Sequence, residues 1–164
     1  MSNDWKIFLE EFRRTIESSA ERLRAISEEQ SERARAEGKW SSKEIVGHLI
    51  DSAANNHQRF VRGQFSRNLV FPGYDQNQWI QAQQYQRESW PLLVELWRLY
   101  NLHLLHVMSC AGEDRLEMKH SEHSLDKIAW ELVSEKDSAT LSYVMRDYVE
   151  HLKHHLAQIF SEEI

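Results

Sequence analysis

A chain of 164 residues, 41% of them hydrophobic, is long enough for one domain, spanning residues 1–164, with one continuous core. Its net charge is −6 and its lysines and arginines are scattered, which excludes the basic surface of a protein that binds nucleic acid or an anionic membrane. No run of about 18 apolar residues occurs, so we predict neither a membrane span nor a signal peptide, and the single cysteine, Cys110, indicates a reducing compartment, the cytoplasm.

Helical periodicity runs through most of the chain. Only five glycines and two prolines interrupt it, and no stretch alternates between polar and apolar residues, so strands have little support. The first helical segment covers residues 4–26. The second begins at Ser41, where Ser41 and Glu44 can form a capping box, and reaches Gln64.

The third helical segment starts at Ser89 and has Pro91 in its first turn, a position that favours proline. Its apolar residues recur at three- and four-residue steps and predict the buried face. They are Leu92, Leu96, Leu99, Tyr100, Leu104 and Val107. The fourth segment covers residues 140–160, and its apolar residues also lie on one side.

Four amphipathic segments of this kind predict an all-α four-helix bundle, because each must cover about a third of its circumference with partners. The connections at residues 66–88 and 111–139 are long enough to cross the bundle or to fold over its end. Inside the first connection, Asp75 is placed to cap a short helix that contains Trp79.

The last predicted helix carries three of the nine histidines, namely His151, His154 and His155. Positions four apart on a helix lie about 6 Å apart, so His151 and His155 can place two imidazole nitrogens on one metal ion. About half of one such pair is expected by chance in a chain with nine histidines, so the spacing also fits surface histidines.

A polar row on the second predicted helix contains His48, Ser52, Asn55 and Arg59. Periodicity alone leaves two alternatives for His48, which either points into a polar pocket at a helix junction or faces water. Ser52 and Asn55, together with Trp79, are the candidate pocket residues. Aromatic residues in a bundle also pack in the core, so Trp79 fits either role.

Three stretches of the sequence resemble the DinB/YfiT-like family, in its DinB_2 branch, in the right order over nearly the whole chain. They are Trp40–Asp51, Tyr74-Asp75 followed by Trp79, and Asp147–His151 followed by His155 and Gln158-Ile159. The resemblance implies a DinB-like four-helix bundle with up-down-down-up topology, in which the connections from helix two to three and from helix three to four are the long ones.

The same resemblance implies a divalent metal bound by three histidines, which fall here on His48, His151 and His155. Zinc is the first choice for imidazole ligands, and nickel, iron or manganese are alternatives. Asp147, four residues before His151, is either a second-shell group that orients that ring or a solvent-facing carboxylate. The resemblance and the six tryptophans of an amphipathic bundle also predict a homodimer.

Three neutral imidazoles leave at least one position on the ion open to water or substrate. A metal-bound water gives a hydrolase. A metal-bound thiolate gives a thiol S-transferase, which the resemblance implies with bacillithiol, mycothiol or glutathione as the low-molecular-weight thiol. We predict a metal-dependent enzyme that acts on a small-molecule substrate, with a thiol S-transferase as the leading hypothesis, a hydrolase as the other reaction type and the catalytic residues unassigned. The alternative is a non-catalytic bundle that binds a ligand or a partner and carries vestigial histidines.

Overall fold

Four long helices make up most of the protein, whose computed structural model describes residues 2–161. They are α1 (Asn3–Ala25), α3 (Ser42–Gly63), α5 (Trp90–Cys110) and α8 (Leu141–Phe160). The connections hold the short helices α2 (Glu28–Glu32), α4 (Gln76–Gln83), η1 (Tyr85–Arg87), α6 (Glu113–Leu116) and α7 (Leu125–Ile128). Between residues 2 and 161 there are isolated β-bridges but no strand, and no helix is apolar enough over sufficient length to cross a membrane. The all-α class is confirmed, and residues 1 and 162–164 of the predicted domain lie outside the described part.

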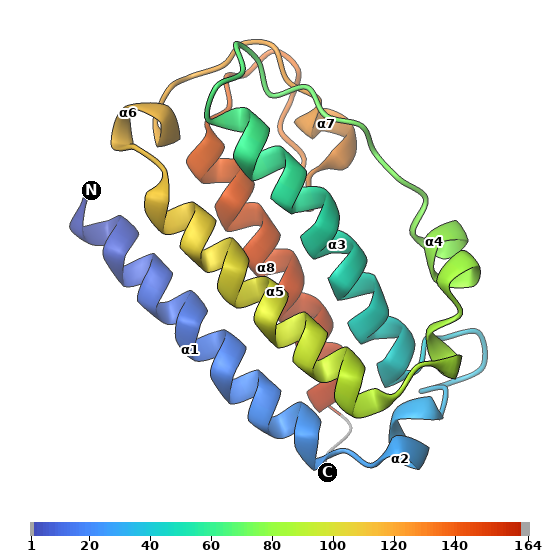
Figure 1. Cartoon of the computed structure of the whole chain (residues 1–164). Coiled ribbons are helices and arrows are strands. Elements are labelled where there is room, and N and C mark those ends of the chain that lie inside the picture. The colour runs from blue at the N-terminus through green and yellow to red at the C-terminus, as the bar shows by residue number, and fades with distance from the viewer. Residues whose placement is uncertain (1, 162–164) are drawn as a thin grey trace.

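The long helices form a four-helix bundle in which α1 and α8 run in one direction and α3 and α5 run in the other (Figure 1). Helix α3 packs against α5 and α8, and α5 also packs against α1. The connection from α3 to α5 therefore runs the length of the bundle, whereas the connection from α5 to α8 folds over one end. This is the up-down-down-up order predicted from the family resemblance.

The predicted starts of α3 and α4 agree with the structure, and a short polar side chain caps each of them. Ser41 and Glu44 form the capping box of α3, with Glu44 N donating to Ser41 Oγ at 3.2 Å and Ser41 N donating to Glu44 Oε2 at 2.8 Å. Asp75 caps α4 and accepts hydrogen bonds from the backbone N–H groups of Asn77 and Gln78.

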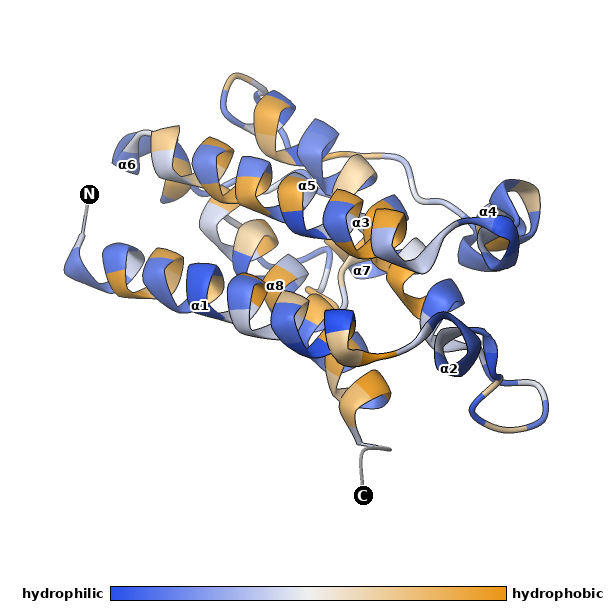
Figure 2. Cartoon of the chain, turned by 60° about the horizontal axis from the view of Figure 1, so that its bottom comes forward, coloured by the Kyte–Doolittle hydropathy of each residue, from blue (hydrophilic) through white to orange (hydrophobic). Residues whose placement is uncertain are grey.

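The face of α5 that packs in the core differs from the predicted one. Leu92, Leu96 and Leu99 are exposed by 54%, 45% and 53%. The buried positions are Trp90, Leu93, Val94, Trp97, Asn101, Leu104, Leu105 and Met108. Apolar residues surround most of α5, so periodicity alone offers two stripes, and the larger tryptophan side chains take the core. In Figure 2, hydrophilic and hydrophobic residues follow one another along the ribbon of each long helix, as expected for a helix with one polar and one apolar side.

The two long connections pair with each other at one end of the bundle. Leu69 N donates to Glu122 O at 3.0 Å, Ser124 N donates to Leu69 O at 3.2 Å, and Phe71 N donates to Ser124 Oγ at 2.9 Å. Leu69 is fully buried beneath these bonds. Beyond this pairing, the two connections line one cavity together, the first with Gly73, Tyr74 and Gln76 and the second with residues 127–130.

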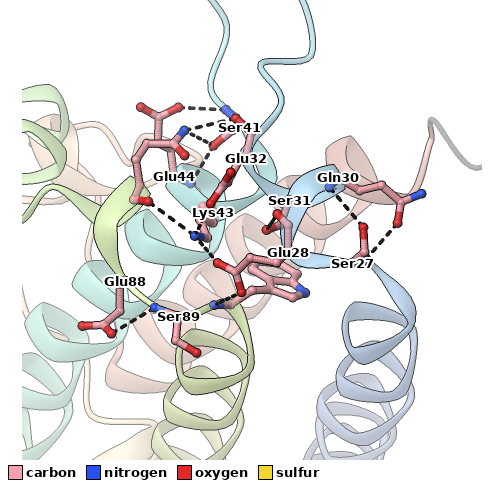
Figure 3. Close-up of polar contacts among 12 residues, drawn as sticks. Ser27, Glu28, Gln30, Ser31, Glu32, Ser41, Lys43, Glu44, Glu88 and Ser89 are labelled. Carbon is pink, nitrogen blue, oxygen red and sulfur yellow. Dashed lines mark hydrogen bonds and ion pairs between the residues drawn. The ribbon is translucent and has the colours of Figure 1, made fainter.

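At the opposite end, a buried lysine joins α2 to the first turn of α3 (Figure 3). The Lys43 side chain is 2% exposed, and its Nζ forms ion pairs with Glu28 and, at 3.0 Å, with Glu32. Glu28 also accepts a hydrogen bond from the backbone N–H of Trp90, at the start of α5. Burial alone lowers the pKa of Lys43, but the two carboxylates outweigh this effect and raise the pKa above its ordinary value of 10.5.

The ion pairs of Lys43 with Glu28 and Glu32 predict that the protein loses stability at alkaline pH. A lysine whose pKa is higher in the folded state stabilises the fold fully below its unfolded pKa, and this contribution disappears as the pH rises through the folded pKa. In urea unfolding between about pH 8 and about pH 11, the difference in free energy of unfolding between wild type and Lys43→Met should shift in favour of the variant. Lys39→Met, which removes an exposed lysine, should keep the wild-type dependence. A difference that stays constant over this range would contradict the prediction.

Candidate metal centre

Three histidines from two helices meet at one point between α3 and α8. One ring nitrogen from each of His48, His151 and His155 lies within 4.8 Å of those from the other two. His48 Nε2 and His151 Nε2 are 3.2 Å apart. Two nitrogens bound to one tetrahedral zinc ion at about 2.0–2.1 Å lie roughly 3.3 Å from each other, so this separation fits a shared ion.

The local geometry follows from helix periodicity and from the packing of α3 on α8. His151 and His155 are four residues apart on α8, which places their rings edge to face with centroids 4.6 Å apart. His48 reaches the pair from α3 and is only 2% exposed. Of the two alternatives left open for His48, the structure therefore selects the polar pocket and not solvent.

Burial keeps the three rings neutral at physiological pH. Burial, together with the neighbouring imidazoles, lowers the pKa of His48 to about 4 and that of His151 to about 3. The pKa of His155 is also lowered, chiefly by burial, although its hydrogen bond to Gln158 opposes the shift. A neutral imidazole offers a nitrogen lone pair, and this is the form that binds a metal ion.

The outer ring nitrogens have partners that orient two of the three rings. His155 Nδ1 donates to Gln158 Oε1 at 2.9 Å, which leaves the lone pair on Nε2. Gln158 Nε2 in turn lies 3.0 Å from His154 Nε2. Ser52 Oγ lies 3.5 Å from His151 Nδ1. The remaining outer nitrogen, His48 Nδ1, is buried without a hydrogen-bond partner among the described residues.

The ring nitrogens of His48, His151 and His155 fit a divalent cation that prefers imidazole ligands, such as zinc, nickel or iron. The cluster contains three neutral nitrogens from a rigid helix pair, and no protein carboxylate joins it within residues 2–161. Gln158 was not predicted as a site residue. Its position three residues after His155 on the same helix is the signal that places it within reach of that ring.

Two tryptophans from the connections flank the histidines. The ring of Trp40 lies 5.2 Å from that of His48, and the ring of Trp130 lies 5.4 Å from that of His151 and 4.5 Å from that of His154. These apolar rings limit the access of water to the cluster. Neither residue was predicted as part of the site, because a position in a connection has no periodicity from which to infer its direction.

Asp147 has a different role from the predicted one. Its two carboxylate oxygens accept hydrogen bonds from the backbone N–H groups of Trp130 and Glu131 at 2.9 and 2.8 Å. No hydrogen bond joins it to a histidine in the described part of the chain. Asp147 therefore fixes the loop that carries Trp130, whose ring contacts His151 and His154.

A cavity of about 210 Å³ opens beside His48 and His151. The predicted pocket residue Ser52 lines it, together with Arg59 and Tyr74 from farther along the chain. Asn55 lies instead beside a separate hollow near Phe71 and Pro72, and its Nδ2 donates to Asp51 O. Trp79 is 36% exposed and packs on Tyr74, with ring centroids 4.9 Å apart, outside the cavity wall.

Comparison with known proteins agrees with this architecture. A protein from Oceanobacillus iheyensis, named as a "Putative metal-dependent hydrolase", is 26% identical over 97% of this chain and 84% of its own length. The solved structure of YfiT from Bacillus subtilis, described as "a probable metal-dependent hydrolase with an unusual four-helix bundle topology", superposes with a TM-score of 0.76. That likeness covers 98% of this chain and 87% of YfiT at 17% sequence identity. The model of the DinB superfamily matches residues 11–159, and the chain therefore belongs to the DinB superfamily.

Proposed function

We propose that this protein is a metal-dependent enzyme in which His48, His151 and His155 bind a divalent cation. The observation that carries the proposal is the convergence of three neutral imidazoles from α3 and α8 within 4.8 Å. The names of the relative from Oceanobacillus iheyensis and of YfiT support metal dependence. Zinc is the first choice of metal because imidazole nitrogens suit it well, nickel and iron are alternatives for the same reason, and manganese is the remaining alternative although it prefers oxygen ligands.

The surrounding residues prepare the cluster for chemistry on a small molecule. Gln158 holds His155 with its Nε2 free, and Trp40 and Trp130 shield the rings from bulk water. The cavity beside His151 supplies the space for a substrate. A divalent ion bound by three imidazoles keeps its full charge and, when present, lowers the pKa of a water or thiol in its open position.

The proposed reaction is hydrolysis of a small molecule by a metal-activated water, which the names of both relatives support. Transfer of a low-molecular-weight thiol to an electrophile is the second candidate, and it rests on the family resemblance of the sequence. A thiol needs the same open position as the water, so the two reactions compete for one site.

The test starts with elemental analysis of the purified wild-type protein after it has been offered zinc, nickel, iron and manganese in turn. One equivalent of metal per chain is expected. The loaded protein is then given a set of activated esters and amides, with and without glutathione or bacillithiol, and both product acid and free thiol are measured. Acid without loss of thiol supports hydrolysis, and metal-dependent loss of thiol supports transfer. A chain that binds none of the four metals would instead be the non-catalytic module.

We further propose that the protein is a cytoplasmic homodimer that uses the exposed stripe of α5. Leu92, Leu96 and Leu99 lie on one face at steps of four and three residues and are about half exposed. In sedimentation equilibrium, Leu96→Glu should convert the dimer to a monomer. Leu132→Glu, which changes a leucine that is 67% exposed in the last connection, should leave the dimer intact. A wild-type monomer, or a dimer in both variants, would rule out this surface.

A further inference from the structure

The cavity beside the histidines contains a buried positive charge that the proposed metal centre does not use. Arg59 is 8% exposed and lies on the side of α3 that carries His48 and Ser52, farther along the helix. His48 and Arg59 both line the cavity of about 210 Å³. One small molecule in this cavity can therefore contact the histidine site and the guanidinium together.

The guanidinium of Arg59 has only neutral partners. Its Nη1 donates to Asn56 Oδ1 at 3.4 Å and its Nη2 donates to Pro72 O at 3.3 Å, both long for hydrogen bonds of this type. No carboxylate between residues 2 and 161 lies within 4.0 Å of it. A guanidinium has five N–H donors, so most of its capacity remains for a ligand.

The other buried cation of the fold is neutralised in the ordinary way. Lys43 is buried to a similar degree and forms ion pairs with Glu28 and Glu32. A charge that is removed from water without an opposite charge is costly, so proteins pair such groups or use them to bind ligands. Arg59 lacks the protein partner that Lys43 has, and the cavity is the place from which a partner can come.

Asp147 lines the same cavity and attracts Arg59 electrostatically, but the two side chains form no ion pair within 4.0 Å of each other. Both of its oxygens are already bonded to the backbone N–H groups of Trp130 and Glu131. Its presence also limits the charge of a ligand, because a doubly charged group would face one guanidinium and one carboxylate. A group with a single negative charge meets less repulsion from Asp147 than a doubly charged group does, and a planar carboxylate matches the two parallel N–H bonds that a guanidinium offers.

We propose that Arg59 binds a carboxylate group of the substrate, at the end of the cavity away from the three histidines. The inference rests on the proposed function, because it assigns a substrate class to the same site. The substrate is a small carboxylic acid, and its size is limited because about 210 Å³ is below the roughly 300–1,000 Å³ of sites for drug-sized ligands.

Titration with sodium acetate, followed by ¹H–¹⁵N NMR of backbone amides that line the cavity, tests the proposal on the full chain. Acetate should bind, and acetamide, its neutral analogue, should not. Arg59→Gln should weaken acetate binding at least tenfold, and Arg59→Lys should weaken it less because the charge remains. Arg62→Gln removes the same charge from an exposed position one turn away on α3 and should change the affinity less than twofold.

Metal content separates this inference from the proposed function. Arg59→Gln should keep its bound metal, and His151→Ala should still bind acetate in the cavity. Acetate binding that is lost in His151→Ala but kept in Arg59→Gln would place the anion on the metal and overturn the role of Arg59, while leaving the enzyme proposal intact. Equal losses in Arg59→Gln and Arg62→Gln would show an unspecific charge effect and would also overturn it.

A measurement on the wild-type chain avoids any folding defect of the variants. Phenylglyoxal modifies accessible guanidinium groups, and peptide mass spectrometry reports each arginine separately. Acetate should slow the modification of Arg59 severalfold, acetamide should not, and the reactivity of Arg62 should stay the same in both. Inorganic phosphate that protects Arg59 better than acetate would replace the carboxylate by a phosphate ester as the substrate class. Equal reactivity of Arg59 with and without every anion would overturn the proposal.

Discussion

Replacing His151 by alanine is expected to remove the metal from the purified protein and to abolish metal-dependent activity. Its Nε2 lies 3.2 Å from that of His48, and its ring meets that of His155 edge to face with centroids 4.6 Å apart, so it contacts both other members of the cluster. Loss of a group that merely orients a ligand typically costs about 10–100-fold in metal affinity. Loss of one of three ligands should cost more than about 100-fold, and the metal content should fall from about one equivalent to nearly none.

Elemental analysis after gel filtration measures this result, with His103→Ala as the matched control. His103 is an exposed histidine on α5, outside the cluster, and its removal should leave one equivalent of metal in place. Saturating zinc should also raise the thermal midpoint of the wild type and of His103→Ala but not of His151→Ala. At a free concentration of about 1,000 times Kd, ligand binding adds roughly 4 kcal/mol, or about 8–16 °C for a chain of this length. A full equivalent of metal in His151→Ala would refute the three-histidine site.

Local signals in the sequence were enough to place the long helices. Ser41 and Asp75 accept hydrogen bonds from backbone N–H groups two or three residues later. Serine and aspartate are preferred at the N-cap of a helix, so the residue type alone predicts these starts. The spacing of His151 and His155 likewise fixes their mutual distance, because both lie on one helix. Within a single element, the sequence pattern and the structure agree.

Periodicity and capping signals do not predict which helices pack against each other or which loop a side chain contacts. His48 lies on the polar side of its helix, and only the packing of α3 on α8 shows that this side is buried. The family resemblance implied that contact, whereas periodicity left both a polar pocket and solvent open for His48. The core face of α5 was misjudged for the same reason, since Leu96 and Trp97 are both apolar and the partners of the helix decide which of them is buried. Asp147 was predicted either to orient His151 or to face solvent, but it bonds to a loop 16 and 17 residues away.

The second large effect is expected from Gly47→Ala, next to His48 on α3. A Cβ atom at Gly47 would lie 2.1 Å from Cδ2 and 2.4 Å from Cγ of Tyr85, so the ring must move. The Tyr85 hydroxyl donates to Asp51 Oδ1 at 2.6 Å, and the same carboxylate has a buried Oδ2 without a partner. Moving the ring therefore deprives a buried carboxylate of one of its two hydrogen-bond donors, Tyr85 and Gln83.

One favourable and two unfavourable contributions set the size of this change in stability. Alanine is favoured over glycine inside a helix by about 1 kcal/mol, whereas overpacking costs about 1–3 kcal/mol and a lost hydrogen bond to a charged group about 1.5–3 kcal/mol. The balance is a loss of roughly 1.5–5 kcal/mol in the free energy of unfolding, measured by urea titration. Gly112→Ala is the control, because a Cβ there meets nothing within 4 Å, and it should change stability by less than about 0.5 kcal/mol.

A double-mutant cycle with Tyr85→Ala isolates the contact between Gly47 and the ring. Without the ring, Gly47→Ala should no longer destabilise the protein and should gain the helix propensity of alanine, about 1 kcal/mol. Persistence of the full loss in the Tyr85→Ala background would mean that the glycine serves another purpose. The expected non-additivity would show that the close approach of Tyr85 to α3, which only a glycine permits, holds the η1 segment against the helix that carries His48.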